Sequence, residues 1–277
     1  MTAAALITLR ETLEASLIVG IVLACLARLH EQRGVLAVWL GVAAGIAGSI
    51  LFAAVIWLTT KELSGRAEEI YEGTTMLVGA ALLTWMILWM MRQSRTIKKH
   101  IEAKVERHIE QRYLFGIFFL TMVSVGREGV ETVLFLQATA FHLGQATHLF
   151  GGILGIVAAI VIAVLLFRGI RFFSLRQFFS VTSALLMLFA AGLVAHGLHE
   201  FIEAGLLPPL IEHVWDTSVI LSEQSIVGTF LKTLLGYNAD PSLLEVLGVV
   251  AYVSVTGILW RYFITAAQPP LHRGLSY

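Results

Sequence analysis

Long apolar runs constrain this chain more than any other feature of its sequence. Seven stretches are mostly apolar over about 20 residues, the length that an α-helix needs to cross a bilayer. They cover residues 3–26, 35–58, 72–91, 113–142, 149–167, 178–203 and 243–264. Only 14% of all residues are charged, against about 25% in a soluble domain. We therefore predict an all-α polytopic protein with seven transmembrane helices, integral to the plasma (inner) membrane and surrounded by the lipid bilayer.

Positive charges between the runs are unevenly distributed. With the N-terminus outside, fourteen of the 19 Lys and Arg residues fall in inner segments. Three fall in outer segments, namely Lys61, Arg66 and Lys232. Loops rich in Lys and Arg stay cytoplasmic, so we predict an N-out, C-in orientation. The formal net charge is zero, which gives no reason to expect a nucleic-acid partner.

Two of the runs carry the same charged motif, Arg-Glu-x-x-Glu. It occupies residues 10–14 in the first run and 127–131 in the fourth. Spans one and four cross the membrane in opposite directions, which is the arrangement of inverted-repeat transporters with a midplane site. We predict a 3+3 inverted repeat plus one C-terminal helix. The expected units are a first three-helix repeat (1–91), a cytoplasmic linker (92–112), a second repeat (113–205), an outer loop with short helices (206–242), and a seventh helix with its tail (243–277).

The charges of both motifs lie deep in the predicted membrane. At about 1.5 Å per residue, Glu11 is roughly 13 Å from the outer end of its span, and Glu131 has a similar depth. A charge at the bilayer centre costs at least about 2.5–3.5 kcal/mol, so these groups need a compensating role. Carboxylates are hard ligands that suit iron, magnesium, calcium or manganese.

Residues at i and i+3 share one helix face, so the glutamates of both motifs converge on one level. We predict a cation site with four carboxylates and two charge partners: Glu11, Glu14, Glu128 and Glu131, with Arg10 and Arg127. The alternative is purely structural, with each arginine locking helices together through one carboxylate. In that alternative, two of the four carboxylates have no arginine partner.

A second group of candidate ligands lies at the outer side of the membrane. His196, His199 and Glu203 fall on one face of the sixth span, and Glu72 begins the third span. We predict these four as outer metal ligands, although a satisfied core histidine is the alternative for His196 and His199.

Other patterns indicate helix packing. Small residues spaced along a helix allow close approach in membranes, and they occur at Gly41, Gly45, Gly48, Gly151, Gly152 and Gly155. Trp85, Trp89 and Met90 are interpreted as interface anchors or core residues, not as part of a cofactor site.

Besides the two Arg-Glu-x-x-Glu motifs, the sequence contains the segments Thr84-Trp85-Met86 to Trp89-Met90, His199-Glu200, Glu203-Ala204-Gly205 and Gly236-Tyr237 to Pro241-Ser242. Together, these features resemble the oxidase-dependent iron permeases. This family holds the fungal high-affinity iron permease and the bacterial EfeU-type transporters. The resemblance spans nearly the whole chain, with Thr12 standing where the family usually has glycine. It implies iron (Fe3+ or Fe2+) as transported substrate and no prosthetic group. It also implies an external ferroxidase or periplasmic iron-binding partner.

We therefore predict a permease that imports iron, as Fe3+ supplied by such a partner, and not an enzyme. One alternative is transport of another cation, such as Fe2+, Pb2+ or Mn2+. A weaker alternative is an intramembrane carboxylate/His metal oxidase. Di-iron helical sites use Glu-x-x-His on two helices, and the sequence contains no such pair. The sequence does not determine the oligomeric state, and an oligomer is one of the alternatives.

Overall fold

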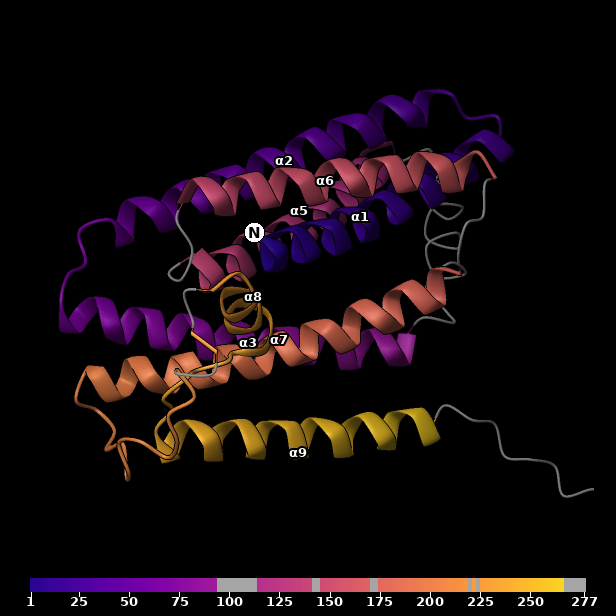
Figure 1. The fold of residues 1–277 in the computed structure, drawn as a ribbon. Helices are drawn as coiled ribbons and strands as arrows, with labels where there is room; N and C mark the ends of the chain where they lie inside the picture. The colour runs from indigo at the N-terminus through magenta and orange to yellow at the C-terminus, as the bar shows by residue number, and fades with distance from the viewer. Residues whose placement is uncertain (94–113, 141–144, 170–173, 219–220, 223–224, 267–277) are drawn as a thin grey trace, which may run out of the picture.

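Eight α-helices form the described part of the computed structural model, which covers residues 1–93, 114–140, 145–169, 174–218, 221–222 and 225–266. They are α1 (Thr2–Arg28), α2 (Arg33–Thr60), α3 (Arg66–Gln93), α5 (Leu114–Ala140), α6 (Gln145–Phe167), α7 (Leu175–Glu203), α8 (Ile226–Leu235) and α9 (Leu243–Ala266). The seven long helices lie along roughly one axis and alternate in direction, whereas α8 is short (Figure 1). No strand occurs among the described residues, in agreement with the predicted all-α class.

Five of these helices are long and apolar enough to cross a membrane: Arg33–Thr60, Arg66–Met90, Leu149–Phe167, Gln177–Glu203 and Leu243–Tyr262. The helices α1 and α5 are not among these five. Each has 27 residues and is therefore about 40 Å long at 1.5 Å per residue, but each carries a charged motif near its middle. The prediction of a polytopic helical membrane protein is therefore confirmed.

The helix α3 begins earlier than the apolar run that predicted it. It starts at Arg66 rather than at Glu72, about a turn and a half sooner. Glu68 and Glu69 lie in its first turn, where negative charge interacts favourably with the N-terminal end of the helix dipole. Hydropathy alone does not detect such a polar first turn.

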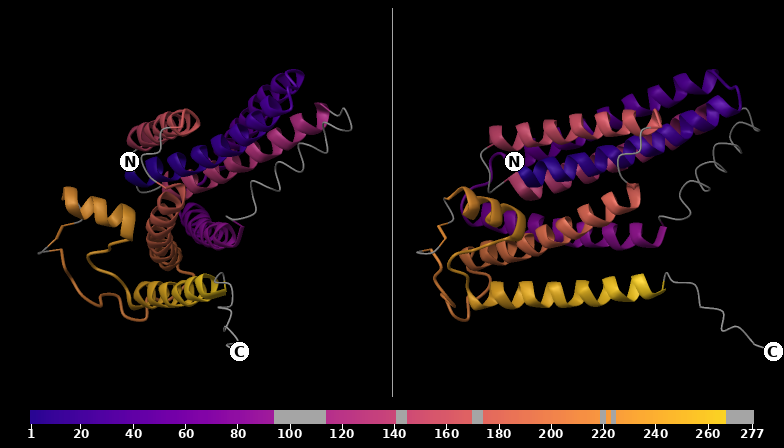
Figure 2. Two further views of the ribbon diagram at one scale, coloured as in Figure 1. Left: turned by 90° about the vertical axis from the view of Figure 1, so that its right-hand side faces the viewer. Right: turned by 45° about the vertical axis from the view of Figure 1, so that its right-hand side comes forward.

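The long helices pack in pairs. The helix α1 packs against α6, α2 packs against α5, and α3 packs against α7. In addition, α1 and α5 contact each other, while α9 contacts α7 and α3 (Figure 2). If the labels of α1 and α5, of α2 and α6, and of α3 and α7 are exchanged, the same pairs of helices are in contact.

Small residues bring α2 close to α5. A methyl group at Gly41 would lie 2.7 Å from the Phe118 carbonyl oxygen, and one at Gly45 would lie 2.9 Å from the Met122 carbonyl oxygen. On the other side of the bundle, a methyl group at Gly155 would collide with Thr8 and the Ala5 backbone of α1.

The prediction of close packing is thus confirmed for these glycines. Gly48 is an exception, since nothing lies within 4 Å of the position of its missing Cβ.

The connection between α7 and α9 contains α8. The Ser225 hydroxyl caps this helix by accepting a hydrogen bond of 2.9 Å from the Gly228 N–H. Gly236, with φ +65°, ends it in the left-handed conformation that favours glycine. The helix packs on α7 and α1, and it is the one helix among the described residues between 206 and 242.

The bundle has two distinct ends. The α2–α3 turn and the α7–α9 connection lie at one, here named the α2–α3 end, and the α1–α2 turn and the last turn of α9 lie at the other, the α1–α2 end (Figure 1). The predicted cytoplasmic linker (92–112) lies almost entirely outside the described residues.

Candidate metal centre

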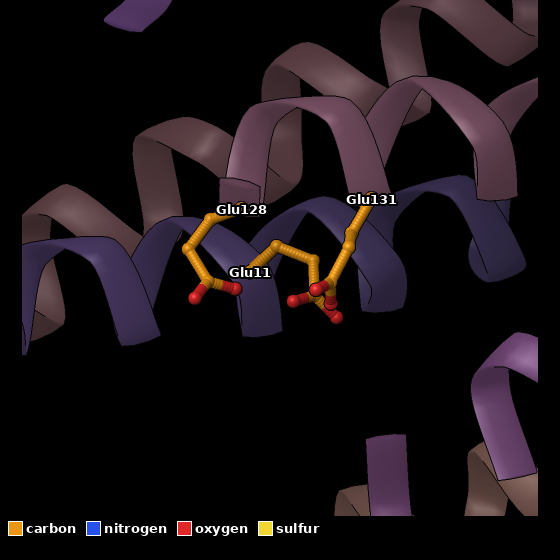
Figure 3. Close-up of side chains that lie close together, drawn as sticks. All are labelled: Glu11, Glu128 and Glu131. Carbon is orange, nitrogen blue, oxygen red and sulfur yellow. The ribbon is translucent and has the colours of Figure 1, made fainter. Parts of the chain in front are cut away.

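The two Arg-Glu-x-x-Glu motifs meet where α1 contacts α5. Glu11, Glu128 and Glu131 each offer one carboxylate oxygen, and these three oxygens lie within 4.8 Å of one another. The side chains come from the two helices and approach one another (Figure 3). Oxygen ligands lie about 2.0–2.6 Å from a bound magnesium or calcium ion, so opposite ligands are about 4–5 Å apart. The three oxygens therefore have the spacing of ligands around one small, hard cation.

Two of the three carboxylates are enclosed by protein, while the Glu131 side chain is 24% exposed. Glu11 and Glu128 are only 1% and 2% exposed. One oxygen of each of the three carboxylates, Oε2, has no hydrogen-bond partner among the described residues. A buried polar atom without a partner is costly, and a carboxylate oxygen more so because it carries charge. A cation bound between these oxygens would compensate that cost.

Glu14 lies beside this group and is not one of its members. It is buried, and its Oε1 is 3.0 Å from Nη2 of Arg10. It also interacts electrostatically with Glu131. Of the four carboxylates that the sequence placed at one level, three lie together and the fourth is held next to them by an arginine.

Each arginine contacts both glutamates of its own motif. The distances are 3.0 Å for Arg10–Glu11 and Arg10–Glu14, 2.9 Å for Arg127–Glu128 and 3.1 Å for Arg127–Glu131. The structural alternative counted one carboxylate per arginine, whereas each arginine contacts two, because the guanidinium presents several donors in a fork that reaches both i+1 and i+4. Four carboxylates and two guanidinium groups still leave a formal charge of −2.

The two arginines have different neighbours on α3. Arg10 Nη1 is 3.2 Å from the sulfur of Met86, and its Nη2 contacts the sulfur of Met90. Cζ of Arg127 lies 5.0 Å from the ring centroid of Trp89, within the range of a cation–π interaction. Met86, Met90 and Trp89 are thus neighbours of the centre that sequence analysis missed. Their spacing along one helix face was visible, but nothing local indicated an arginine partner.

The predicted outer ligands form a separate group. His199 Nδ1 is 3.1 Å from Glu245 Oε1, and its Nε2 is 3.3 Å from Glu203 Oε1. The ring therefore bridges two carboxylates, and a metal ion would have to displace one of them. His196 Nδ1 lies 2.9 Å from the Gly192 carbonyl oxygen of its own helix.

Glu72 lies near further acidic side chains. It interacts electrostatically with Glu68, Glu69, Glu200 and Glu203, which come from the adjoining ends of α3 and α7. The assignment of Glu72, His196, His199 and Glu203 as outer metal ligands stays a prediction.

Glu245 was missed as a partner of His199. It is buried at the start of α9, where it accepts hydrogen bonds from Ser242 Oγ (2.8 Å) and Asn238 Nδ2 (2.9 Å). Ser242-x-x-Glu245 ahead of an apolar run has the pattern of a capping box. That pattern was visible in the sequence, but the contact with His199 was not.

The chain is similar to known permeases along most of its length. The model of the iron permease FTR1 family matches residues 1–269. Ferrous iron permease EfeU of Escherichia coli O6:H1 (strain CFT073) is 35% identical over 243 residues, covering 87% of this chain and 88% of that protein. Ferrous iron permease EfeU of Yersinia pestis is 35% identical over 245 residues, covering 87% and 86%.

No solved structure matches the chain. The relatives carry the name of permeases, in agreement with the prediction that the chain is not an enzyme. A family match over 269 residues and paired motifs that meet between α1 and α5 lead to the same conclusion. The chain belongs to the iron permease FTR1 family and is an integral protein of the inner membrane.

Proposed function

We propose that this chain imports iron through the centre formed by Glu11, Glu128 and Glu131. The observation that carries the proposal is the approach of three carboxylate oxygens to within 4.8 Å at the buried contact of α1 and α5. Glu14 supports the centre through Arg10, from which it is 3.0 Å away. Iron is here the transported substrate and not a resident cofactor.

Fe2+ is the ion that the charges of this centre support best. The two motifs carry a formal charge of −2, which a divalent ion neutralises. Buried charge is stable only when it is compensated, and a trivalent ion would leave an excess positive charge. The relatives are named ferrous iron permeases, which adds to this argument. Import of Fe3+ from an external ferroxidase or periplasmic partner stays an untested prediction.

In the proposed membrane arrangement, α1 and α5 are spans in addition to the five apolar helices, giving seven. Charges at mid-membrane are tolerated where they face the bundle interior, and the motifs do so at the contact of α1 and α5. The paired packing of α1 with α6 and of α2 with α5 supports an inverted repeat. The charge bias supports the α2–α3 end as the outer one.

Labelling of single cysteines tests this orientation. Ser64 lies at the exposed α2–α3 turn and Gln32 at the exposed α1–α2 turn. In a Cys25→Ser background, a cysteine replacing Ser64 should react with an impermeant reagent added to intact cells, and one replacing Gln32 should not. The opposite pattern would reverse the orientation and exclude import through an outward-facing entrance at the α2–α3 end.

Uptake into liposomes tests the function. Purified protein would be reconstituted and supplied in parallel with Fe2+ kept reduced, chelated Fe3+, Mn2+ and Pb2+. We expect saturable Fe2+ uptake that is lost in Glu128→Gln protein inserted to the same level. Preferred Fe3+ uptake would replace the ferrous assignment, and full Fe2+ uptake by the Glu128→Gln protein would remove the carboxylate centre from the pathway.

A further inference from the structure

Arg127 competes with a cation for the carboxylates of the centre. It contacts Glu128 and Glu131, which are two of the three grouped carboxylates. Arg10 contacts only one of the three, Glu11, and otherwise binds Glu14. Like charges a few ångströms apart repel strongly where the dielectric is low. A divalent ion therefore cannot be bound well while Arg127 keeps both contacts.

The side chain of Arg127 has room to leave, and that of Arg10 does not. The Arg127 side chain is 43% exposed, whereas that of Arg10 is 0% exposed. Arg10 is enclosed by two carboxylates and by the sulfur atoms of Met86 and Met90. Of the two guanidinium groups, only Arg127 can withdraw without opening the helix packing.

The exposed part of Arg127 must meet water rather than lipid. The residue lies at the middle of α5, which runs from Leu114 to Ala140. A guanidinium that faces hydrocarbon at this depth is expensive, and charged residues inside spans usually face the bundle or a water-filled cavity. On this argument the exposed side of Arg127 faces water, which gives the guanidinium a direction in which to withdraw.

Trp89 contacts Arg127 in the same arrangement in which Arg127 contacts both carboxylates. Its ring lies 5.0 Å from Cζ of Arg127, and the face of an indole ring attracts a guanidinium. Trp89 belongs to the last two turns of α3, towards the α1–α2 end of the bundle. A small swing would keep Arg127 on the ring while it releases the two carboxylates, so its charge stays beside the centre and the formal charge of −2 still applies.

We propose that Arg127 is a tethered competing cation that leaves Glu128 and Glu131 when the transported ion enters, rests on Trp89, and returns to expel the ion. This inference rests on the proposed function, since it takes the carboxylate centre as the ion site. Arg127 and Trp89 are then positioning residues and not ligands. The sequence pattern alone treats Arg10 and Arg127 as equivalent, and this assignment separates their roles.

Steady-state Fe2+ uptake by inserted protein tests the proposal. Arg127→Gln removes the competing charge, so we expect the apparent KM and the maximal rate both to fall by about tenfold or more, which corresponds to at least about 1.4 kcal/mol for each. Arg127→Lys keeps the charge and should recover most of the rate. Trp89→Leu should raise the KM several-fold, because Arg127 loses the contact that would remain after it leaves the carboxylates. Trp85→Leu is the matched control, since Trp85 is 72% exposed and should leave both parameters unchanged.

A charge-rescue experiment separates charge from shape. In a Cys25→Ser background, Arg127→Cys would be treated with a cationic aminoethyl thiosulfonate or with a neutral methyl thiosulfonate. Only the cationic reagent should restore the rate. Equal rescue by both reagents, or no reaction from the aqueous phase, would overturn the proposal.

The outcomes for the two proposals are distinct. If Glu128→Gln abolishes uptake while Arg127→Gln leaves KM unchanged or raises it, the centre stands and the role of Arg127 is wrong. If Glu128→Gln transports normally, the carboxylate centre itself is wrong, whatever Arg127 does.

Discussion

The α1 motif and the α5 motif have the same pattern but different surroundings. In α1, Arg10 is fully buried between carboxylates and methionine sulfur atoms. In α5, Arg127 is 43% exposed and lies over Trp89. Both arginines use the same fork geometry toward i+1 and i+4, so the local sequence fixes the ion pairs. The neighbouring helix α3 decides whether the arginine is enclosed or accessible.

The difference extends to the second glutamate of each motif. Glu131 belongs to the group of three carboxylates, whereas its counterpart Glu14 is held at Arg10. The two helices that carry the motif thus contribute unequally, with one carboxylate from α1 and two from α5. Approximate symmetry in sequence does not produce equivalent half-sites.

The largest expected effect comes from removing one carboxylate from each half. Glu11→Gln and Glu128→Gln keep side-chain size but remove a charge that the dehydrated ion needs. Each should lower Fe2+ uptake by at least about a hundredfold, since loss of one partner of a buried charge costs several kcal/mol. Uptake would be normalised to membrane-inserted protein. A Glu11→Gln protein with normal uptake would show that α1 contributes no ligand.

Replacing Arg10 and replacing Arg127 should have different effects on the amount of folded, membrane-inserted protein. Arg10→Ala leaves Glu11 and Glu14 buried without their partner, a loss of about 3–5 kcal/mol, so little inserted protein is expected. Arg127→Ala should lose less inserted protein than Arg10→Ala, because the Arg127 and Glu131 side chains are 43% and 24% exposed, whereas those of Arg10 and Glu11 are 0% exposed. Detergent-extracted protein measured by size-exclusion chromatography gives the comparison. Equal losses for both variants would mean that the difference in exposure has no energetic consequence.

Enlarging a glycine on α2 that packs closely against α5 should destabilise the contact between these two helices. Gly45→Val places a side chain against the Met122 carbonyl oxygen of α5, and such overpacking costs about 1–3 kcal/mol. A lower melting temperature in detergent is expected. Gly48→Val on the same helix is the matched control, since Gly48 has no neighbour within 4 Å of its missing Cβ. Similar melting temperatures for the two variants would contradict the close contact of α2 and α5.

The smallest expected effect concerns Glu14. Because it lies beside the three-carboxylate group, Glu14→Gln should raise the KM for Fe2+ by several-fold and retain measurable uptake. Glu131→Gln should instead behave like Glu128→Gln. Kinetic comparison of the two variants checks this order. Complete loss of uptake in Glu14→Gln protein would restore the fully symmetric four-carboxylate site that the motif pattern suggests.

The sequence by itself determined the membrane class, the extent of most helices and the identity of the charged motifs. Apolar run length and the i, i+3 spacing are local properties of a helix, so they can be predicted without tertiary structure. The opposite directions of α1 and α5, seen in Figure 1, also follow from counting runs. Short-range pairs such as Arg10 with Glu14 come from the same helical geometry.

Only the tertiary structure decided which groups meet between helices. It brought Glu11 to Glu128 and Glu131, enclosed Arg10 with the methionines of α3, and joined His199 to Glu245 across α7 and α9. Such contacts depend on how each helix is rotated and how closely it approaches its neighbours. Packing of small residues on the facing helices sets that rotation and approach, and no local pattern within a single helix contains this information.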